Sequence, residues 1–267
     1  EYEEYICDKF VEQFAEQERI VRALRSDFIS FPIFSFMTLL HVPFHSSLAR
    51  VGRVSGAISV DFYSNGAQEA GFWAKLMRNQ ARGPSFLTLA AGKYSYGSAR
   101  FARDLATSAV HSPAVLIWAW VYAQPASPPE GLMKEYYRPG NYGVMSGMFH
   151  RIAKIEPYLV PSASTAKIAL VYSERESMWD QNGTVAWARA SDGFVGHCYL
   201  LHCAFGQLGV QYEPVFEELI DADQLARYQV VILPRIGYIS PKTRSALEAW
   251  VKAGGSPVAL GRVGNKD

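Results

Sequence analysis

The residues best suited to chemistry lie toward the ends of two apolar, strand-like segments, 58–64 and 115–123. They are Asp61, Tyr63, Trp118, Trp120 and Tyr122. Because residues two apart share one face of a strand, Asp61 and Tyr63 form one expected pair and the three other aromatic residues form one expected row. Carboxylate oxygens accept hydrogen bonds from hydroxyl groups, and aromatic rings offer flat apolar faces for stacking. These residue types in this pattern are compatible with contact with a carbohydrate.

Each candidate also has a purely structural alternative. Asp61 could cap the turn after its strand or pair with an arginine, and the tryptophans could pack in the core if their face meets a layer of helices. Glu130 and Glu135 lie in the polar, proline-containing loop that follows the tryptophans, where carboxylates are more often solvated. Glu174 and Glu176 follow a further expected strand, at the position where open α/β sheets bind ligands.

The cluster with the most metal-like composition lies within one expected helix. It contains His197, Cys198, His202 and Cys203. A structural zinc site takes four converging ligands, usually from two separated pairs, and a single helix cannot wrap a metal in that way. The chain contains no GxSxG or GxCxG nucleophile elbow, no phosphate-binding loop and no GxGxxG, while Gly254-Gly255 has the character of a helix stop. We therefore expect neither a metal nor a cofactor.

The composition excludes several classes of protein. The chain has 267 residues, of which 49% are hydrophobic and 19% charged, so it can bury a sizeable core. A net charge of +1 and the absence of a basic run argue against nucleic acid as a partner, and no apolar stretch is long enough to predict a membrane span. Three cysteines do not make a disulfide scaffold. The first residues show no signal segment, which slightly favours a cytoplasmic location but leaves the localisation unknown. The chain opens within a helical pattern without Met, as we expect of a fragment or a processed chain.

The elements that must position the candidate residues alternate between strands and helices. In the first half, we expect helices over 3–24, 67–82, 98–110 and 142–159, and strands over 28–36, 58–64, 84–91 and 115–123. Short, nearly continuous apolar strands between amphipathic helices are typical of parallel strands that are buried on both faces. This pattern suits either half of an eight-stranded βα barrel or an open, doubly wound sheet.

A small, polar segment with a proline, 160–165, interrupts this pattern and predicts a linker. Strand and helix patterns resume after it. We expect strands over 167–173, 210–216, 229–234 and 257–261, and helical segments over 193–206, 222–227 and 241–253. The second half therefore begins a second parallel α/β layer.

The order of short signals in the second half resembles a known domain. After the strand 167–173 come Tyr199 and His202 on a helix and then Leu208-Gly209-Val210; further on come 224–228, Ile239-Ser240 and 247–255 before a last apolar strand. In this order they resemble the trimerisation domain of the β-galactosidases of glycoside hydrolase family 42. That domain is similar to a class I glutamine amidotransferase domain that has lost its catalytic machinery. The resemblance covers about 166–267.

The resemblance implies a fold and a division into domains. The first half, residues 1–160, is similar in order and position to the C-terminal part of a (β/α)8 barrel, with 58–63, 84–91 and 115–123 as its strands six, seven and eight. Residues 166–267 would form a flavodoxin-like or amidotransferase-like doubly wound domain, present in part. The implied partners are a carbohydrate substrate and further copies of the chain in a homo-oligomer, most naturally a trimer.

Two departures from the family bear on catalysis. The family's strand seven ends in the nucleophilic glutamate, whereas the matching position here is about Ala90 and no acidic residue occurs over 84–99. The family's general acid/base lies on strand four, which this chain does not contain. Retaining glycosidases need two carboxyl groups about 5–5.5 Å apart. The catalytic residues are therefore unknown, and we expect the isolated chain to be inactive.

Two functions remain open at this point. The chain is expected to be a portion of a carbohydrate-active glycoside hydrolase of β-galactosidase type, supplying part of the sugar cleft and the oligomerisation domain. The alternative is a non-catalytic sugar-binding or assembly module that has lost its catalytic carboxylates.

Overall fold

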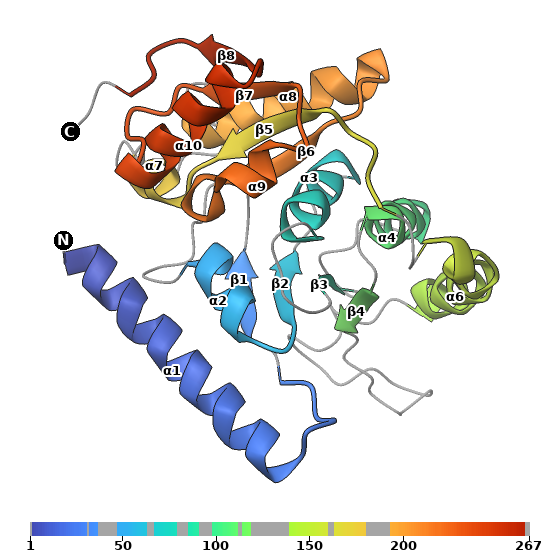
Figure 1. Ribbon diagram of the computed structural model, residues 1–267. Coiled ribbons are helices and arrows are strands. Elements are labelled where there is room, and N and C mark those ends of the chain that lie inside the picture. The colour runs from blue at the N-terminus through green and yellow to red at the C-terminus, as the bar shows by residue number, and fades with distance from the viewer. Residues whose placement is uncertain are drawn as a thin grey trace.

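The computed structural model of the chain contains two four-stranded sheets, each made of parallel strands (Figure 1). The structure describes residues 2–30, 32–36, 47–62, 67–78, 85–90, 98–111, 114–118, 139–159, 163–179 and 193–264. In β1, β3, β4 and the last two residues of β2 the description is of the backbone.

The first sheet has the strand order β1-β2-β3-β4. Its elements are α1 (Tyr2–Leu24), β1 (Ile33–Phe36), α2 (Leu48–Val54), β2 (Ile58–Phe62), α3 (Ala67–Arg78), β3 (Ser85–Ala90), α4 (Ser98–His111), β4 (Ala114–Trp118) and α6 (Pro139–Leu159). Strands that are neighbours in sequence are also neighbours in the sheet, and a helix separates each pair, as parallel pairing requires. The carboxyl ends of all four strands therefore lie at one edge.

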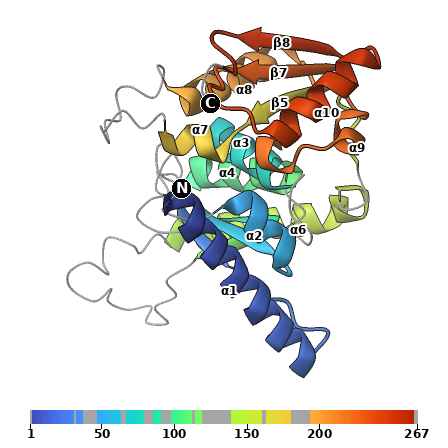
Figure 2. The ribbon, with the colours of Figure 1, turned by 60° about the vertical axis from the view of Figure 1, so that its left-hand side comes forward.

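The second sheet has the order β6-β5-β7-β8. Its elements are β5 (Ile168–Tyr172), α7 (Glu174–Trp179), α8 (Phe194–Leu208), β6 (Glu213–Phe216), the 3₁₀ turn η1 (Glu217–Leu219), α9 (Ala222–Leu225), β7 (Val230–Pro234), α10 (Pro241–Lys252) and β8 (Ser256–Leu260). Helix α8 lies on one side of this sheet and α10 on the other, while β8 at the edge of the sheet is exposed (Figures 1 and 2). The parallel α/β layer expected for the second half is therefore present.

Several predicted boundaries need correction. The strand expected over 28–36 begins only at Ile33, and the side chains of Phe28 and Ile29 are exposed. The apolar run 28–36 predicted a longer strand, because hydrophobicity alone does not show whether its first residues are buried. Helices α2 and α7 were not predicted, because both are short and their sequences carry no strong period. Helix α8 ends at Gly209, whose φ of 66° is the left-handed conformation that favours glycine.

The predicted linker joins two sheets rather than strands of one. Strands β4 and β5 belong to different sheets, and residues 163–167 between α6 and β5 have no regular secondary structure. Residues 160–162 of the expected linker lie outside the described residues. The division into two domains stays a prediction, since the hydrophobic core is continuous across it.

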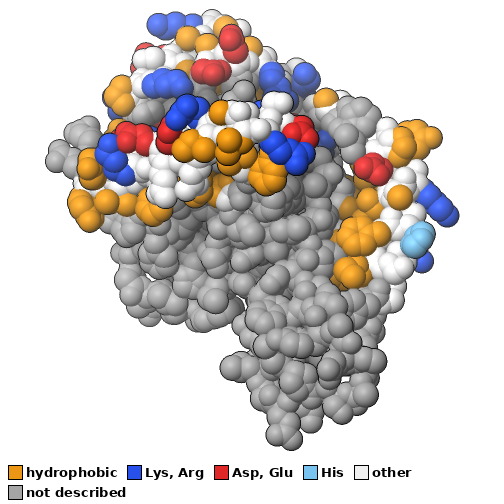
Figure 3. Space-filling view, turned by 90° about the horizontal axis from the view of Figure 1, so that it is seen from below, with side chains coloured by type: hydrophobic (Ala, Val, Ile, Leu, Met, Phe, Trp, Pro, Cys, Tyr) orange, Lys and Arg blue, Asp and Glu red, His pale blue; other side chains and the backbone are white. Residues whose placement is uncertain are grey.

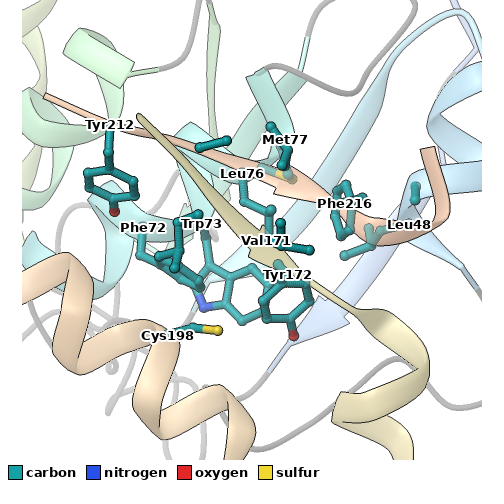
Figure 4. Packing of buried hydrophobic residues seen from close by; sticks show 14 of the residues in the cluster. Leu48, Phe72, Trp73, Leu76, Met77, Val171, Tyr172, Cys198, Tyr212 and Phe216 are labelled. Atoms are coloured by element: carbon teal, nitrogen blue, oxygen red, sulfur yellow. The ribbon is translucent and has the colours of Figure 1, made fainter. Parts of the chain in front are cut away.

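The hydrophobic core extends from the first half into the second through side chains of helix α3. Phe72 is fully buried, and its ring lies 6.0 Å from that of Tyr172 in β5 and 5.7 Å from that of His202 in α8. Trp73 lies 5.9 Å from Tyr172, so both aromatic residues of α3 pack under the second sheet. Figure 4 shows this packing, with Cys198 of α8 beside the same rings. One cluster of buried side chains thus stabilises both halves together.

Helix α1 lies along one side of the molecule, and one of its ends projects beyond the first sheet (Figures 1 and 2). It contacts α2, and the salt bridge between Arg50 and Asp8 ties the two helices. Large apolar side chains of α1 remain exposed all the same, among them Tyr2, Tyr5 and Leu24. In the view from below, hydrophobic side chains are interspersed with charged ones (Figure 3).

Candidate functional site

A row of polar residues crosses the first sheet near the carboxyl ends of its strands. Asp61 of β2 is in register with Ser35 of β1 on one side and with Thr88 of β3 on the other. Residues in register on neighbouring parallel strands share one face of the sheet. The register therefore places Asp61 between a serine and a threonine at positions that share one face of the sheet.

The last residues of the strands complete this edge. Trp118 is the final residue of β4 and is in register with Ala90, the final residue of β3. The strand positions of Asp61 and Trp118 thus lie toward the same edge of the sheet, with β3 between them. The structure describes the backbone of these two residues; Tyr63, Trp120 and Tyr122 lie outside the described residues, as do Glu130 and Glu135.

Sequence reasoning missed Ser35 and Thr88. Ser35 is the single polar residue of the strand IFSF, and Thr88 is the polar residue in the interior of the strand SFLTLA, which begins with Ser85. That signal was available, but its meaning depends on register: only the pairing of β1, β2 and β3 shows that the two residues flank Asp61.

The chemistry that this row can perform is hydrogen bonding to hydroxyl groups. A carboxylate accepts hydrogen bonds, and Ser and Thr hydroxyls both donate and accept them. Glycoside hydrolysis needs two carboxyl groups in different roles. The register places Ala90 at the end of β3, the strand position at which the second carboxylate is expected. Asp61 is thus the single acidic residue among the described residues of the four strands of the first sheet.

The carboxyl edge of the second sheet holds buried glutamates whose partners belong to the fold. Glu174, at the start of α7, accepts hydrogen bonds from the Ser47 hydroxyl and from the backbone N–H of Ala49, 3.3 Å away, at the start of α2. Burial raises the pKa of Glu174 to about 7, although these hydrogen bonds act to lower it. The carboxylate of Glu174 thus connects the second sheet to α2.

The neighbouring glutamates make similar internal contacts. Glu176 accepts from the backbone N–H groups of Gly237 and Tyr238, at 3.0 and 3.2 Å. Glu217 accepts from Ser240, which is the N-cap of α10. Because their oxygens are engaged in this way, Glu174 and Glu176 are better explained as structural residues than as ligand contacts.

Another carboxylate at this edge carries an unsatisfied oxygen. Glu218 accepts through Oε1 from the backbone N–H of Arg175 at 3.1 Å, while its Oε2 is buried without a hydrogen bond. Burial, followed by the negative charges of Glu174 and Glu217, raises the pKa of Glu218 to about 8.

His197, Cys198 and His202 lie on α8 in different surroundings. Cys198 is fully buried in the core, and burial raises the pKa of its thiol. His202 is hydrogen bonded to the hydroxyl of Tyr212, and Nδ1 of His197 lies 2.9 Å from the carbonyl oxygen of Gly193. Within the described ranges, no three His, Cys, Asp or Glu side chains converge in a way that could hold a metal ion. Nor does any helix described in the structure have the length and apolar character needed to cross a membrane.

Comparison with known proteins gives a result at the level of the fold. No family model matches the sequence, and no curated protein matches it significantly. Solved structures of β-galactosidases do match. One is a GH42 β-galactosidase from G. stearothermophilus, with a TM-score of 0.75 and 15% identity over 97% of this chain and 40% of that one.

Two further matches agree with it. The polyextremophilic β-galactosidase of the Antarctic haloarchaeon Halorubrum lacusprofundi has a TM-score of 0.75 and 15% identity over 97% of this chain and 41% of its own. The β-galactosidase of the psychrophilic Marinomonas ef1 has a TM-score of 0.68 and 15% identity over 95% of this chain and 42% of its own. The chain thus has an α/β fold that resembles a portion of these enzymes and spans about two fifths of their length.

Proposed function

We propose that the chain is a portion of a glycoside hydrolase of β-galactosidase type, where it supplies part of the sugar cleft. The observation that carries this proposal is that one continuous superposition on a GH42 β-galactosidase covers 97% of the chain, both sheets and the junction between them included. A match to one sheet alone would indicate a common α/β layer. A match to both, in the same arrangement, favours a common architecture of the whole portion.

The cleft is proposed at the carboxyl edge of the first sheet. Parallel α/β folds bind ligands at the carboxyl ends of their strands. The row of Ser35, Asp61 and Thr88 lies in that region and supplies hydroxyl and carboxylate groups that suit a sugar. Trp118 ends the neighbouring part of the edge. We assign sugar contacts to Asp61, Tyr63, Trp118, Trp120 and Tyr122.

The first sheet needs further strands for this role. Four strands do not close into a barrel, so both β1 and β4 remain edges of the described sheet. Exposed aromatic residues on α1 such as Tyr2 and Tyr5 support the proposal that another part of the protein packs nearby. In this proposal, the remaining strands and the catalytic carboxylates come from that part.

A second candidate is a sugar-binding or assembly module without catalysis. It is favoured by one observation, which is that β3 ends in Ala90 where a nucleophilic glutamate is expected. In this alternative, Asp61 still binds a hydroxyl group, but no second carboxylate completes the site.

Assembly is proposed through the second sheet, most naturally as a trimer. Strand β8 lies at the edge of the sheet and is exposed along its whole length, with Val258 and Leu260 among the exposed apolar residues. An exposed apolar edge strand is a surface that proteins usually cover. Further copies of the chain are the proposed cover.

The two candidate functions are separated by substrate turnover in the complete protein. Nitrophenyl β-galactoside is the first substrate, with nitrophenyl β-glucoside and α-galactoside beside it. Turnover of the β-galactoside supports the hydrolase. Saturable galactose binding without turnover of any of the three supports the binding module, and the absence of both overturns the assignment to carbohydrates.

A further inference from the structure

A cavity of about 380 Å³ lies at the junction of the two halves of the chain. Its lining includes the last turns of α3 and α4, residues 163–165 before β5, and residues 211–213 at the start of β6. A cavity of this volume is in the range of small-molecule sites. It opens at the amino ends of β5 and β6, whereas the glutamates described above lie at the carboxyl ends.

Basic side chains give this cavity a positive character. Lys75 and Arg78 come from the last turn of α3, and Nζ of Lys75 lies 4.5 Å from the centre of the Tyr212 ring. Burial lowers the pKa of Lys75, which means that part of its hydration has been lost. A partly desolvated ammonium group gains most from an anion placed beside it.

His111 lines the same cavity as Lys75 and Arg78. Its pKa is lowered to about 4, first by burial and then by the positive charges of Lys75, His202 and Arg78. The imidazole is therefore neutral near pH 7. It offers one donor and one acceptor to the cavity without adding charge.

A buried carboxylate oxygen in the wall lacks a donor. Glu213 is 3% exposed, and its Oε2 accepts from the hydroxyl of Tyr228 and from Nη2 of Arg227, 3.3 Å away. Its Oε1 is buried without a hydrogen bond. Leaving such an oxygen unsatisfied is costly, so a donor from within the cavity would stabilise it. Among the described lining residues, Lys75 and Arg78 carry positive charge and Glu213 carries the negative charge, which also acts on Lys75.

Small polar groups complete the wall. The hydroxyl of Thr165 donates to Oε1 of Gln211 at 3.0 Å, and the hydroxyl oxygen of Ser164 accepts from the backbone N–H of Ala166 at 3.2 Å. The Ser164 hydroxyl retains its own proton for donation. The lining therefore combines cations, a hydroxyl donor and one carboxylate acceptor.

We propose that this cavity binds a small anion that also carries hydroxyl groups, of the chemical class of sugar phosphates and sugar acids. The anionic group lies against Lys75 and Arg78, and a ligand hydroxyl donates to Oε1 of Glu213. The lining of the cavity carries this inference, so it does not rest on the proposed hydrolase activity and is tested by binding alone.

The test is isothermal titration of the complete protein with four probes. Galactose 6-phosphate and galacturonate carry both the charge and the hydroxyls, galactose carries the hydroxyls alone, and inorganic phosphate carries the charge alone. We expect at least one of the first two to bind about tenfold more tightly than either single-feature probe. The comparison between these two distinguishes a phosphate from a carboxylate as the anion. Raising the salt concentration should weaken this binding in the unmodified protein.

Substitution of Lys75 places the binding in this cavity. Lys75→Met keeps the apolar stem and removes the charge, so we expect about tenfold weaker binding of the preferred probe, in line with the loss of one charged hydrogen bond. Lys9→Met is the matched control, because Lys9 is exposed on α1 and pairs with Glu12. If Lys75→Met unfolds, Arg78→Gln serves in its place.

Four outcomes would overturn the proposal. They are no binding of any anionic probe, Lys75-dependent binding of galactose as tight as that of both sugar anions, binding of inorganic phosphate as tight as that of both sugar anions, and unchanged affinity in a Lys75→Met protein that keeps the melting temperature of the unmodified protein.

Discussion

Asp61 is the residue on which the proposed sugar site depends most. Its strand position between Ser35 and Thr88 gives a carboxylate with hydroxyl-bearing neighbours near the carboxyl edge of the sheet. A carboxylate in that setting can bind a sugar hydroxyl, and it can also orient a neighbouring group. Only substitution in the complete protein separates a sugar contact from a role in the fold.

Asp61→Ala and Trp120→Ala are expected to weaken galactose binding by about tenfold each. The first removes a charged acceptor and the second an aromatic stacking surface. Titration calorimetry measures the affinity, and the melting temperature shows whether each variant folds. Unchanged affinity in both folded variants would remove the two residues from the site.

Phe72 tests the shared core. Its side chain is fully buried under β5 and α8, so Phe72→Ala should lower the free energy of unfolding by about 3–5 kcal/mol. The exposed Phe149 of α6 provides the control, for which Phe149→Ala should cost about 0.5 kcal/mol or less. Urea denaturation measures both. A loss as small as that of the control would mean that α3 does not connect the two halves.

Glu218 tests the electrostatics of the junction. A carboxyl group whose pKa is raised on folding binds more protons in the folded state than in the unfolded one, so the free energy of unfolding falls as the pH rises through the interval between the two pKa values. For Glu218 that interval runs from about 4.5 to about 8. Glu218→Gln keeps an acceptor for the Arg175 N–H and removes the charge.

We therefore expect Glu218→Gln to be more stable than the unmodified protein at pH 8 and to show a flatter dependence of stability on pH between 5 and 8. Urea denaturation at four pH values across this range measures the effect. Glu12→Gln is the control, because Glu12 is exposed and paired with Lys9. A slope equal to that of the unmodified protein would show that Glu218 is not buried as a charged group.

At the scale of elements, the alternation of strands and helices could be predicted from the sequence, while several contacts could not. The long amphipathic helix at the start and the strands at Ile58, Ser85 and Ser256 follow from local patterns that the structure confirms to within a few residues. Helix α2 has seven residues and depends on Ser47 and Glu174, which are 127 positions apart. The local hydrophobic pattern of a sequence cannot indicate a contact between residues so far apart.

The polar row of the candidate site shows the same limit. Ser35, Asp61 and Thr88 can each be recognised in the sequence as a polar residue in an apolar strand, but their alignment depends on register across three strands. The cavity beside Lys75 was not predicted either. Its lining comes from four separate segments, which the packing of α3 against β6 and of α4 against α3 brings together.

A further prediction concerns the exposed edge strand β8. Val258→Glu places a charge on the exposed apolar edge and should weaken self-association at least about tenfold. Val110→Glu, at an exposed position of α4, is the control. Sedimentation of the complete protein measures both. A complete protein that is already monomeric at micromolar concentration would contradict assembly through this edge.

At the scale of the whole molecule, the two halves resemble one portion of a β-galactosidase in fold and in arrangement. The register places one carboxylate, Asp61, in the candidate row and an alanine at the end of β3. A hydrolase needs a proton donor for the leaving group and a second carboxylate that attacks or activates water. Our proposal is accordingly that this chain shapes part of a sugar cleft and that the rest of the complete protein supplies the catalytic groups.

The most direct test is the rate of nitrophenyl β-galactoside hydrolysis, measured side by side for the complete protein and for the isolated 267-residue chain. We expect turnover by the complete protein and none above background by the isolated chain. Turnover by the isolated chain that disappears in Asp61→Asn would overturn the proposed division of roles, because Asp61 would then be catalytic and the chain sufficient by itself.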